Sequence, residues 1–515
     1  MEVYTHFNVS SRARYSVRLS AIAATVPGVR VTQDVETDVR RVVYDSRRVE
    51  PGDVFVAIRG AAQDGAAYAA DAINRGAAAI LADRDLAVPP GVGMAVASNP
   101  RSALGQIASL LHGRPSEQLR LVGVTGTDGK TTTCQLVSEV LAAAGRRVGW
   151  MTTVDVRMGD EVMRNPFGHT TPEAPEIQDT LARMVASGVE DVVLEVSSHA
   201  LVLERVQGCT FDAAVFTNLA PEHLNFHGTV EEYVAAKARL FEMLDSPTEK
   251  RWSRMGVVNA DDPASMTMVG SSPAGIVSYG IETPADVSAE RIELGIGGSR
   301  FNLVTPIGEV PVSTRLVGRH NVYNWLAAAA VGLGWGIDLA AVAAAAATAE
   351  PPAGRLQRMH RGQPFEVIVD FAHTPQALEA TLTTLRAFCD GRLFLVFGMA
   401  GGRDAASRPH MGQLAARYAD YFIVSTDDPL EENPADIANE VAAGARAAGA
   451  VEGGDFDIEL DRRSAIARLL ARATPGDVVL LAGKGHEQRQ MIGDRVEPWS
   501  DPDTAVELLA EMGYG

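Results

Sequence analysis

A segment rich in glycine and threonine, with a single lysine, follows an apolar stretch near residue 121 and reads LVGVTGTDGKTTT. Glycines let the backbone curl so that several N–H groups face one anion, and the next helix adds its positive end. Lys130 could reach the terminal phosphates of a nucleotide, and Thr131 or Thr132 could ligate Mg²⁺. Val124 stands where the common P-loop template has its first glycine. The segment predicts a phosphate site, with a plain strand–helix turn as the alternative.

In two later segments, polar residues lie at the end of an apolar run or directly after it. Glu195 lies near the end of the apolar run in DVVLEVSSHALVLERV, where an unpaired carboxylate would be costly. A metal ion would relieve that cost, and a structural salt bridge would do so equally well. Glu222, His223, His227 and Lys237 follow within TNLAPEHLNFHGTVEEYVAAKARLF. Two histidines beside acidic residues favour metal or phosphate chemistry over simple packing.

Four polar clusters in the last third of the chain also follow apolar runs. They are Asp370 and His373 in VDFAHTP, Arg403 and Arg408 in FGMAGGRDAASRPHMG, Asp427 and Asp428 in STDDPLEENP, and Gly483, Lys484, His486 and Glu487 in AGKGHEQ. Any one of them could be a solvated loop. Because open α/β sheets bind ligands at the carboxyl ends of their strands, the four together predict a second substrate site.

The elements that must position these groups alternate between apolar strands and helices. Such strands are VVYDS, DVFVAI, AAAILAD and MAVAS, then RRVGWMTTV, DVVLEVS, AAVFTNL and GVVNA, then EVIVDFAH, RLFLVFG, YFIVST and DVVLLAG. The blocks cover residues 20–118, 119–350 and 351–515, and Pro351, Pro352 and Gly354 mark the last boundary. We therefore predict an α/β protein of three domains.

Composition restricts the class of partner. The 515 residues carry a net charge of −19, which argues against nucleic acid as a partner but allows anionic small molecules in a local positive pocket. The three cysteines are far apart, which argues against a disulfide framework. No apolar run has the length of a membrane span, so no membrane partner is expected.

In this order, the motifs resemble the ATP-dependent Mur ligases of peptidoglycan precursor synthesis, and most of all the MurE type. The resemblance begins near residue 40 and runs through YDSR, GDVFVAIRG, GVTGTDGKTTT, HTTPE, EVSSHALVLERV, TNLAPEHLNFHG, AAK, GRHNVYN, VDFAHTP, GGRD, RPHMG and GKGHE. It implies a uridine-binding N-terminal α/β domain, a central P-loop ATPase-like domain and a Rossmann-like C-terminal domain for the amino acid. It also implies a cytoplasmic monomer that serves cell-wall biogenesis, cell shape, cell division and the cell cycle.

The resemblance implies a reaction as well. ATP would phosphorylate the γ-carboxylate of D-glutamate in UDP-N-acetylmuramoyl-L-alanyl-D-glutamate, and the amino group of an amino acid would displace the phosphate. This chemistry chiefly needs positive charge on the transferring phosphoryl group. By resemblance, Lys130, Glu195, His223 and Lys237 are catalytic. Thr131 would hold the Mg²⁺ of ATP, and Glu195 and His223 a second ion beside Lys237, which CO₂ would convert to a carbamate.

The other binding residues implied by the resemblance form three groups. On the ATP side they are Gly126, Thr127, Asp128, Gly129, Lys130, Thr131, Thr132, Asn321, Asn324, Asp370 and His373. For the UDP-sugar peptide they are Tyr44, Ser46, Thr170, Thr171, Ser197 and Arg205. For the incoming amino acid they are Arg403, Asp427, Asp428, Leu430, Gly483 and Glu487. Three positions depart from the family pattern, namely Asp128, Leu203 and His320.

The segment DDPL at 427–430 bears on the choice of amino acid. Members that add diaminopimelate carry D-N-P-R there, and the arginine pairs with the distal carboxylate of the substrate. Leu430 cannot form that pair, so the sequence favours L-lysine or L-ornithine, with meso-diaminopimelate as the alternative. Asp427, Asp428, Glu431 and Glu432 would suit a side-chain ammonium, or they form a solvated acidic loop.

Two other classes of protein share parts of this pattern. A folylpolyglutamate synthase-like ligase has the ATP loop but generally lacks the N-terminal uridine domain, whereas about 100 residues precede the loop here. A non-catalytic nucleotide-binding homologue would have no need of Lys130, Glu195, His223 and Lys237 together.

Overall fold

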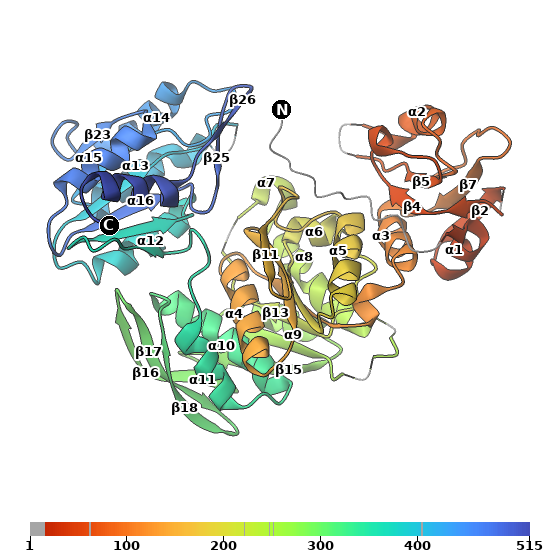
Figure 1. Ribbon diagram of the computed structural model, residues 1–515, viewed down its shortest axis with the longest axis horizontal. Coiled ribbons are helices and arrows are strands. Elements are labelled where there is room, and N and C mark those ends of the chain that lie inside the picture. Colours follow the sequence, from red (N-terminus) through yellow and green to blue (C-terminus); the bar gives the residue numbers. More distant parts are fainter. Residues whose placement is uncertain are drawn as a thin grey trace. The chain divides into compact units, whose positions relative to one another are not determined.

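A computed structural model describes residues 16–34, 36–60, 63–220, 222–246, 248–250, 252–402 and 405–515 (Figure 1). Backbone contacts divide the chain into two compact units. Unit 1 comprises Met1–Ile292, Phe301–Ser313 and His320–Thr348. Unit 2 comprises Glu293–Arg300, Thr314–Arg319 and Ala349–Gly515.

The first sheet of unit 1 has five strands in the order β2-β7-β6-β5-β4, and all neighbours except β2 and β7 are parallel. Its strands are β2 Val29–Gln33, β4 Arg41–Val43, β5 Asp53–Val56, β6 Ala79–Ala82 and β7 Gly93–Ala97, and a separate pair is β1 Val17–Arg18 with β3 Asp38–Val39. The helices are α1 Leu19–Thr25, η1 Ser46–Arg48, η2 Gly65–Tyr68, α2 Ala69–Asn74, α3 Pro100–Leu111 and η3 Pro115–Glu117. Strands β5 and β6 are buried along their whole length, as expected for parallel strands covered on both faces.

The second sheet has eleven strands in the order β11-β10-β9-β12-β8-β13-β14-β15-β16-β17-β18, with a parallel section from β9 to β16. The strands are β8 Arg120–Thr125, β9 Val148–Met151, β10 Asp155–Met158, β11 Glu161–Arg164, β12 Asp191–Glu195, β13 Ala213–Phe216, β14 Met255–Asn259, β15 Gly275–Gly280, β16 Val287–Gly295, β17 Gly298–Thr305 and β18 Gly308–Thr314. The helices are α4 Lys130–Ala143, α5 Ala174–Ala186, α6 Ser198–Val202, α7 Leu224–His227, α8 Val230–Glu242, η4 Met243–Asp245, α9 Ser265–Ser271, α10 Arg319–Gly334 and α11 Leu339–Thr348.

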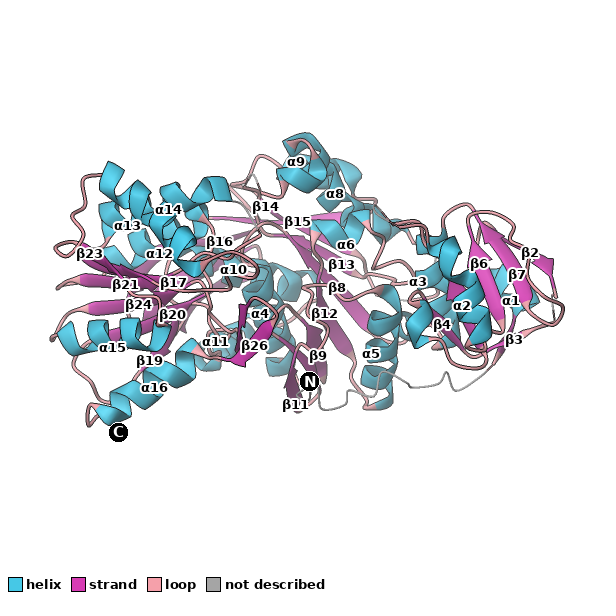
Figure 2. Ribbon diagram, turned by 90° about the horizontal axis from the view of Figure 1, so that it is seen from above, coloured by secondary structure: helices cyan, strands magenta, loops and turns pink. Residues whose placement is uncertain are grey.

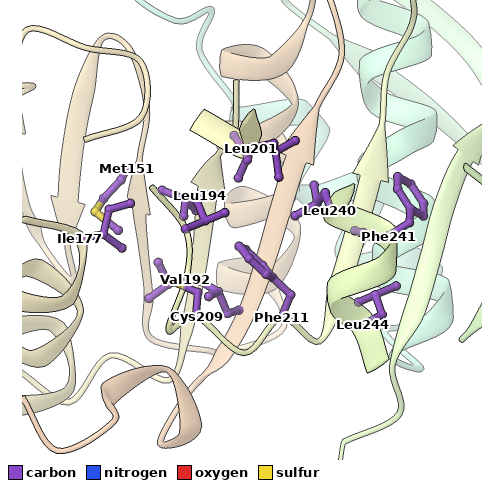
Figure 3. Packing of buried hydrophobic residues seen from close by; sticks show 14 of the residues in the cluster. Met151, Ile177, Val192, Leu194, Leu201, Cys209, Phe211, Leu240, Phe241 and Leu244 are labelled. Atoms are coloured by element: carbon purple, nitrogen blue, oxygen red, sulfur yellow. The ribbon is translucent and has the colours of Figure 1, made fainter. Parts of the chain in front are cut away.

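A glycine on the central strand β8 lets helix α8 pack closely on this sheet. A Cβ atom at Gly123 would lie 2.7 Å from Leu240 Cδ1 and 2.9 Å from Phe211 Cε1. Figure 3 shows Leu240 and Phe211 in the buried cluster that fills this side of the sheet. Because Lys237 lies one helical turn before Leu240, this packing brings its side chain to the carboxyl end of β8.

The sheet of unit 2 has six strands in the order β19-β20-β24-β21-β22-β23, and only β19 runs antiparallel to its neighbour. The strands are β19 Gln357–Met359, β20 Glu366–Asp370, β21 Leu393–Phe397, β22 Tyr421–Val424, β23 Phe456–Ile458 and β24 Val478–Ala482, followed by a hairpin of β25 Arg489–Ile492 and β26 Arg495–Pro498. The helices are α12 Pro375–Arg386, η5 Ala405–Ser407, α13 Arg408–Tyr418, α14 Pro434–Ala447, α15 Arg462–Arg472 and α16 Asp501–Glu511. Figure 2 shows helices on both faces of this sheet.

Side-chain caps begin four helices of unit 2, namely α12, α14, α15 and α16. Thr374, Asn433, Asp461 and Ser500 each accept a hydrogen bond from a backbone N–H of the first helical turn. Such caps satisfy donors that the helix itself leaves unpaired. The caps fix where each polar loop stops, and so they hold the loops that carry the predicted site residues.

The predicted alternation of strands and helices is confirmed in all three sheets. The antiparallel hairpin β10–β11 and the long strands β16–β18 were not predicted, because their apolar residues do not form continuous runs. Within the described ranges, no helix combines the length and the apolar composition that crossing a membrane requires.

Candidate functional site

Two glycines shape the loop between β8 and α4. Gly126 has φ 152°, and a Cβ atom there would lie 1.8 Å from Thr217 Oγ1. Gly129 has φ 79°, and a Cβ atom there would lie 2.5 Å from Asn324 Oδ1. Positive φ and these close approaches restrict both positions to glycine.

Lys130 and Asp128 have opposite environments on this loop. Lys130 Nζ donates to the carbonyl oxygens of Gly126 (3.1 Å) and Thr127 (2.6 Å), so the ammonium lies within the curl of the loop. The backbone N–H of Asp128 donates to Asn218 Oδ1 at 2.9 Å, while the Asp128 side chain is exposed. The exposure accounts for how an acid is tolerated where the family usually has asparagine.

Asn321 and Asn324 on α10 support the same loop. Thr133 Oγ1 donates to Asn324 Oδ1 at 3.2 Å, and Asn324 Nδ2 donates to Asn321 Oδ1 at 2.9 Å. All three side chains are buried. Helix α10 therefore brings the predicted adenine-side residues against the first turn of α4.

Glu195 is a buried carboxylate held by neutral donors. Its Oε2 accepts hydrogen bonds from Thr131 Oγ1 (2.9 Å) and the Thr153 N–H (2.8 Å), and its Oε1 accepts one from Thr153 Oγ1 (3.0 Å). Among the residues that the structure describes, no lysine, arginine or histidine forms an ion pair with it. Hydroxyl and carboxylate oxygens are hard ligands of the kind that Mg²⁺ prefers, so Thr131 and Glu195 fit a magnesium ion.

Lys237 lies beside the loop with its amine enclosed. It is 1% exposed, donates from Nζ to Gly126 O at 2.8 Å, and lies 4.1 Å from the centre of the Tyr233 ring. Burial, with a contribution from Lys130, lowers the pKa of Lys237 well below its usual value. Tyr233 OH is 3.1 Å from Thr127 Oγ1, which ties this helix to the phosphate loop.

His223 belongs to a cluster of rings next to α7 and α8. Its ring centre lies 4.7 Å from that of His199, which stacks on Phe226 at 4.1 Å. His227 Nε2 lies 2.9 Å from Ser198 Oγ. Burial and the neighbouring histidines lower the pKa of His199 to about 4, so this imidazole is neutral near pH 7. Neutral imidazoles are the form that binds metal ions.

Four of the residues predicted for the UDP-sugar peptide lie around Glu195. Thr170 Oγ1 lies 3.0 Å from Thr153 Oγ1, and Thr171 Oγ1 donates to the carbonyl oxygen of Glu195 at 2.9 Å. The Ser197 N–H donates to Thr171 Oγ1 at 3.0 Å. Arg205 Nη1 donates to Thr171 O at 3.1 Å. The predicted peptide contacts and the buried carboxylate therefore form one connected network.

The other two, Tyr44 and Ser46, lie at the end of β4 and the start of η1. Ser46 is buried, and the hydroxyl of Tyr44 donates to Glu176 Oε1 on α5 at 3.3 Å. Arg48 Nη1 also lies 3.3 Å from that oxygen, beside a cavity of about 40 Å³. The phenol of Tyr44 thus joins the first sheet of unit 1 to α5, a contact that sequence spacing did not predict.

In unit 2, Asp370 and His373 follow the carboxyl end of β20. Asp370 accepts hydrogen bonds from the backbone N–H groups of Leu356 (2.7 Å) and Ala372 (3.0 Å). His373 precedes the cap residue of α12. Arg403, predicted to bind the amino acid, lies outside the described residues.

The acidic residues predicted for the amino acid already have a cation of their own. Lys484 Nζ lies 2.8 Å from Asp428 Oδ1, 2.6 Å from Glu487 Oε2 and 3.6 Å from Asp427 Oδ1. The backbone of Gly483 packs against the same group, since a Cβ atom at this position would lie 2.8 Å from Asp427 Oδ2. The single ammonium of Lys484 therefore already faces both acids, and binding of a substrate ammonium by Asp427 and Asp428 stays a prediction.

Leu430 has a left-handed backbone conformation, with φ 52°. Its N–H donates to Met491 O at 3.2 Å, and the residue forms a bridge to Ile492 on β25. The hairpin β25–β26 therefore fixes the loop at the position where the family pattern has arginine.

Three residues of the site were not given a role by sequence reasoning. Tyr233 precedes Lys237 by four residues, a spacing that places both on one helix face and could have identified it. Thr153 follows strand β9, so the preference of ligands for strand ends could have identified it too. Lys484 lay within a noted motif, but nothing in the sequence shows which carboxylates it meets.

Three family models match the chain in order. They are the Mur ligase family catalytic domain at residues 38–109, the Mur ligase middle domain at 124–332 and the Mur ligase glutamate ligase domain at 354–485. The predicted α/β architecture of three domains is confirmed, with sheets that mix parallel and antiparallel strands.

Similar proteins cover nearly the whole chain. The UDP-N-acetylmuramoyl-L-alanyl-D-glutamate--2,6-diaminopimelate ligase of Geobacillus kaustophilus (strain HTA426) is 42% identical over 497 residues, 96% of this chain and 100% of that protein. The UDP-N-acetylmuramyl-tripeptide synthetase of Roseiflexus sp. (strain RS-1) is 43% identical over 492 residues, 93% of this chain and 96% of that protein. A solved structure of a UDP-N-acetylmuramoyl-L-alanyl-D-glutamate--2,6-diaminopimelate ligase matches with a TM-score of 0.69 and 29% identity, covering 97% of this chain and 100% of that one. The chain therefore belongs to the Mur ligase family, and it is an ATP-dependent ligase that forms a peptide bond and releases ADP and phosphate.

Proposed function

We propose that this ligase adds the third amino acid to UDP-N-acetylmuramoyl-L-alanyl-D-glutamate in peptidoglycan precursor synthesis. The observation that carries the proposal is the connection of the phosphate loop, through Thr131 and Glu195, to the predicted peptide-binding residues. Atoms that would meet ATP and atoms that would meet the dipeptide thus share one carboxylate. The names of the similar proteins support the same substrate.

In this reaction the residues of unit 1 have separate tasks. Lys130 and the backbone N–H groups of the loop orient and neutralise the transferring phosphoryl group. Thr131 and Glu195, together with His223 from the segment before α7, would hold magnesium, which supplies further positive charge when bound. Thr170, Thr171, Ser197 and Arg205 orient the dipeptide, so that its γ-carboxylate reaches the phosphate.

We further propose that Lys237 acts as a carbamate. Burial lowers the pKa of its enclosed amine and so favours the neutral form, and a neutral amine attacks CO₂, forming an N–C bond and releasing one proton. The product carries a carboxylate, which suits a cation site better than an ammonium does. Carbon-13 NMR of protein equilibrated with labelled bicarbonate would detect the carbamate, and Lys237→Ala should lose the signal and nearly all activity. Formate or acetate should restore part of that activity, and full activity without them would contradict the proposal.

For the added amino acid we propose meso-diaminopimelate, in place of the lysine or ornithine favoured by Leu430. Similar ligases from Geobacillus and Bacillus species are named for diaminopimelate. Asp427 and Asp428 already pair with Lys484, which weakens the argument for a distal ammonium. Phosphate release with a panel of the three amino acids tests the assignment. A higher kcat/KM with lysine or ornithine than with meso-diaminopimelate would identify lysine or ornithine as the added amino acid.

The organisation of the molecule completes the proposal. We place domain boundaries at residues 20–118, 119–350 and 351–515, with the UDP-sugar site in the first, the ATP site in the second and the amino-acid site in the third. We infer a cytoplasmic enzyme, because the reaction consumes ATP, and we propose that it acts as a monomer. Light scattering of the purified protein with its substrates would test the monomer.

A further inference from the structure

The side chain of Lys484 is fully buried, and the proposed function gives it no task. It follows β24, and its ammonium meets three carboxylates from two separate segments. Asp427 and Asp428 belong to the loop after β22, whereas Glu487 belongs to the turn after β24. One carboxylate oxygen from each of these three residues lies within 4.8 Å of the other two, a spacing that could also hold a metal ion.

The charges of this group depend on one another. The three carboxylates raise the pKa of Lys484 although burial acts in the opposite direction, so the amine stays charged. Burial raises the pKa of Glu487, and Lys484 acts to lower it. One ammonium therefore faces three acids, and without it the carboxylates would repel one another across about 5 Å or less of low-dielectric space.

Glu487 is the member of the group that can reach a ligand. Its side chain is 34% exposed, against 8% for Asp427 and 16% for Asp428. Its Oε2 is engaged by Lys484 at 2.6 Å, which fixes the direction of the carboxylate. The same ammonium holds Asp428, and through it the loop that ends at Leu430.

We propose that Lys484 is a positioning residue for the incoming amino acid. Its ammonium joins Glu487 to the 427–430 loop, so that both surfaces of the amino-acid site keep one relative geometry. The inference rests on the proposed function for the identity of the substrate. The charge cluster of Lys484 with Asp427, Asp428 and Glu487 does not depend on that identity. Removing the ammonium should weaken binding of the amino acid and leave the ATP and dipeptide sites in unit 1 unchanged.

Kinetics of Lys484→Met test this directly. We expect the KM for the amino acid to rise roughly tenfold or more, with the KM values for ATP and the UDP-dipeptide within about twofold of wild type. Lys484→Arg keeps the positive charge and should recover part of the loss. Lys250→Met is the matched control, because Lys250 is also buried and pairs with Asp212 at 2.6 Å, in unit 1. It should lower stability without a selective change in the KM for the amino acid.

Metal binding gives a second measurement that does not need turnover. Lys484→Met leaves three carboxylates at the spacing of a metal site, so electron paramagnetic resonance should count one more bound Mn²⁺ than in wild type. Adding Asp428→Asn to this variant should abolish the extra ion. The double variant also carries one buried charge fewer, so it serves for the kinetics if Lys484→Met does not fold.

The outcomes separate the two proposals. A folded Lys484→Met protein with an unchanged KM for the amino acid, or with all three KM values raised equally, overturns the positioning role. If Lys484→Met binds the same number of Mn²⁺ ions as wild type, the three carboxylates do not form the cluster described above. A wild-type protein that joins no amino acid to the UDP-dipeptide refutes the proposed function instead, while the Mn²⁺ count still tests Lys484.

Discussion

Gly129 and Gly145 flank helix α4 with almost the same backbone conformation, φ 79° and 80°. A Cβ atom at Gly129 would lie 2.5 Å from Asn324 Oδ1, whereas one at Gly145 would have no atom within 4 Å. The two positions therefore carry the same conformational strain but differ in steric contact. A comparison of substitutions at the two positions therefore separates the steric effect of a Cβ atom in the phosphate loop from the effect of the backbone conformation.

We expect Gly129→Ala to lower kcat/KM for ATP by roughly a hundredfold or more, because the methyl group displaces Asn324 and opens the loop. Gly145→Ala should cost about 1 kcal/mol of stability and leave ATP kinetics unchanged. Steady-state kinetics and thermal unfolding of both variants measure this. Equal ATP kinetics in the two variants would contradict the steric argument.

A half-buried histidine in unit 1 makes stability depend on pH. Burial and the nearby Arg183 lower the pKa of His112 to about 4 from its ordinary 6.5. Between these values the unfolded chain binds more protons than the folded chain, so stability falls as the pH drops from 6.5 towards 4. The full loss is at most about 3.5 kcal/mol, since the pKa falls from 6.5 to about 4 and one pKa unit corresponds to about 1.4 kcal/mol.

His112→Gln should lose less stability than wild type on acidification from pH 7 to pH 4.5. Urea unfolding at several pH values measures the difference. His410→Gln, on an exposed position of α13, is the control and should follow the wild type. Parallel curves for wild type and His112→Gln would show that the imidazole is not buried in this way.

At the scale of elements, the hairpin β25–β26 holds the amino-acid loop. Buried Gln490 on β25 donates from Nε2 to the carbonyl oxygens of Thr426 (3.3 Å) and Asp427 (2.9 Å). Met491 N–H donates to Asp428 Oδ1 at 2.9 Å. The hairpin thus completes a site whose acids belong to an earlier loop.

We expect Gln490→Leu to raise the KM for the amino acid roughly fivefold to tenfold, because two buried carbonyl groups lose their donor, at about 1–3 kcal/mol in total. The KM for ATP should stay constant. Val496→Thr, at a side chain 59% exposed on the neighbouring strand, should leave both constants unchanged. An unchanged KM for the amino acid in Gln490→Leu would mean that the hairpin does not shape the site.

The parallel strands and the strand-end motifs could be predicted because apolar runs and glycine spacing are local in the sequence. The contacts of Lys484 with Asp427 and Asp428, and the partners of Tyr44 and Glu195, could not, since these contacts join segments that only the folded protein brings together. The interpretation of Leu430 shows the limit most clearly. It treated Asp427 and Asp428 as unpaired, although their counter-ion lies 56 residues later in the chain.

At the scale of the whole molecule, each compact unit contains a fully buried ion pair. Lys250 pairs with Asp212 in unit 1, and Arg462 pairs with Asp501 in unit 2, both at 2.6 Å. Removing one member of such a pair typically costs about 3–5 kcal/mol, because the other charge stays buried. The two pairs can therefore report on the two units separately.

We expect calorimetry of the wild type to show two unfolding transitions. Lys250→Met should lower the temperature of one transition, and Arg462→Met the temperature of the other. A single transition that both variants shift equally would mean that the units unfold together.

The two units differ in where the positive charge that balances their buried carboxylates comes from, as Glu195 and Lys484 show. Unit 2 carries the cation for its acidic cluster within its own covalent chain, whereas among the described residues Glu195 in unit 1 has no charged partner of this kind. A chelator should therefore lower the stability of unit 1 and leave that of unit 2 unchanged. If Thr131 and Glu195 hold magnesium as proposed, lowering the free magnesium concentration should change the phosphate loop before it changes the amino-acid site.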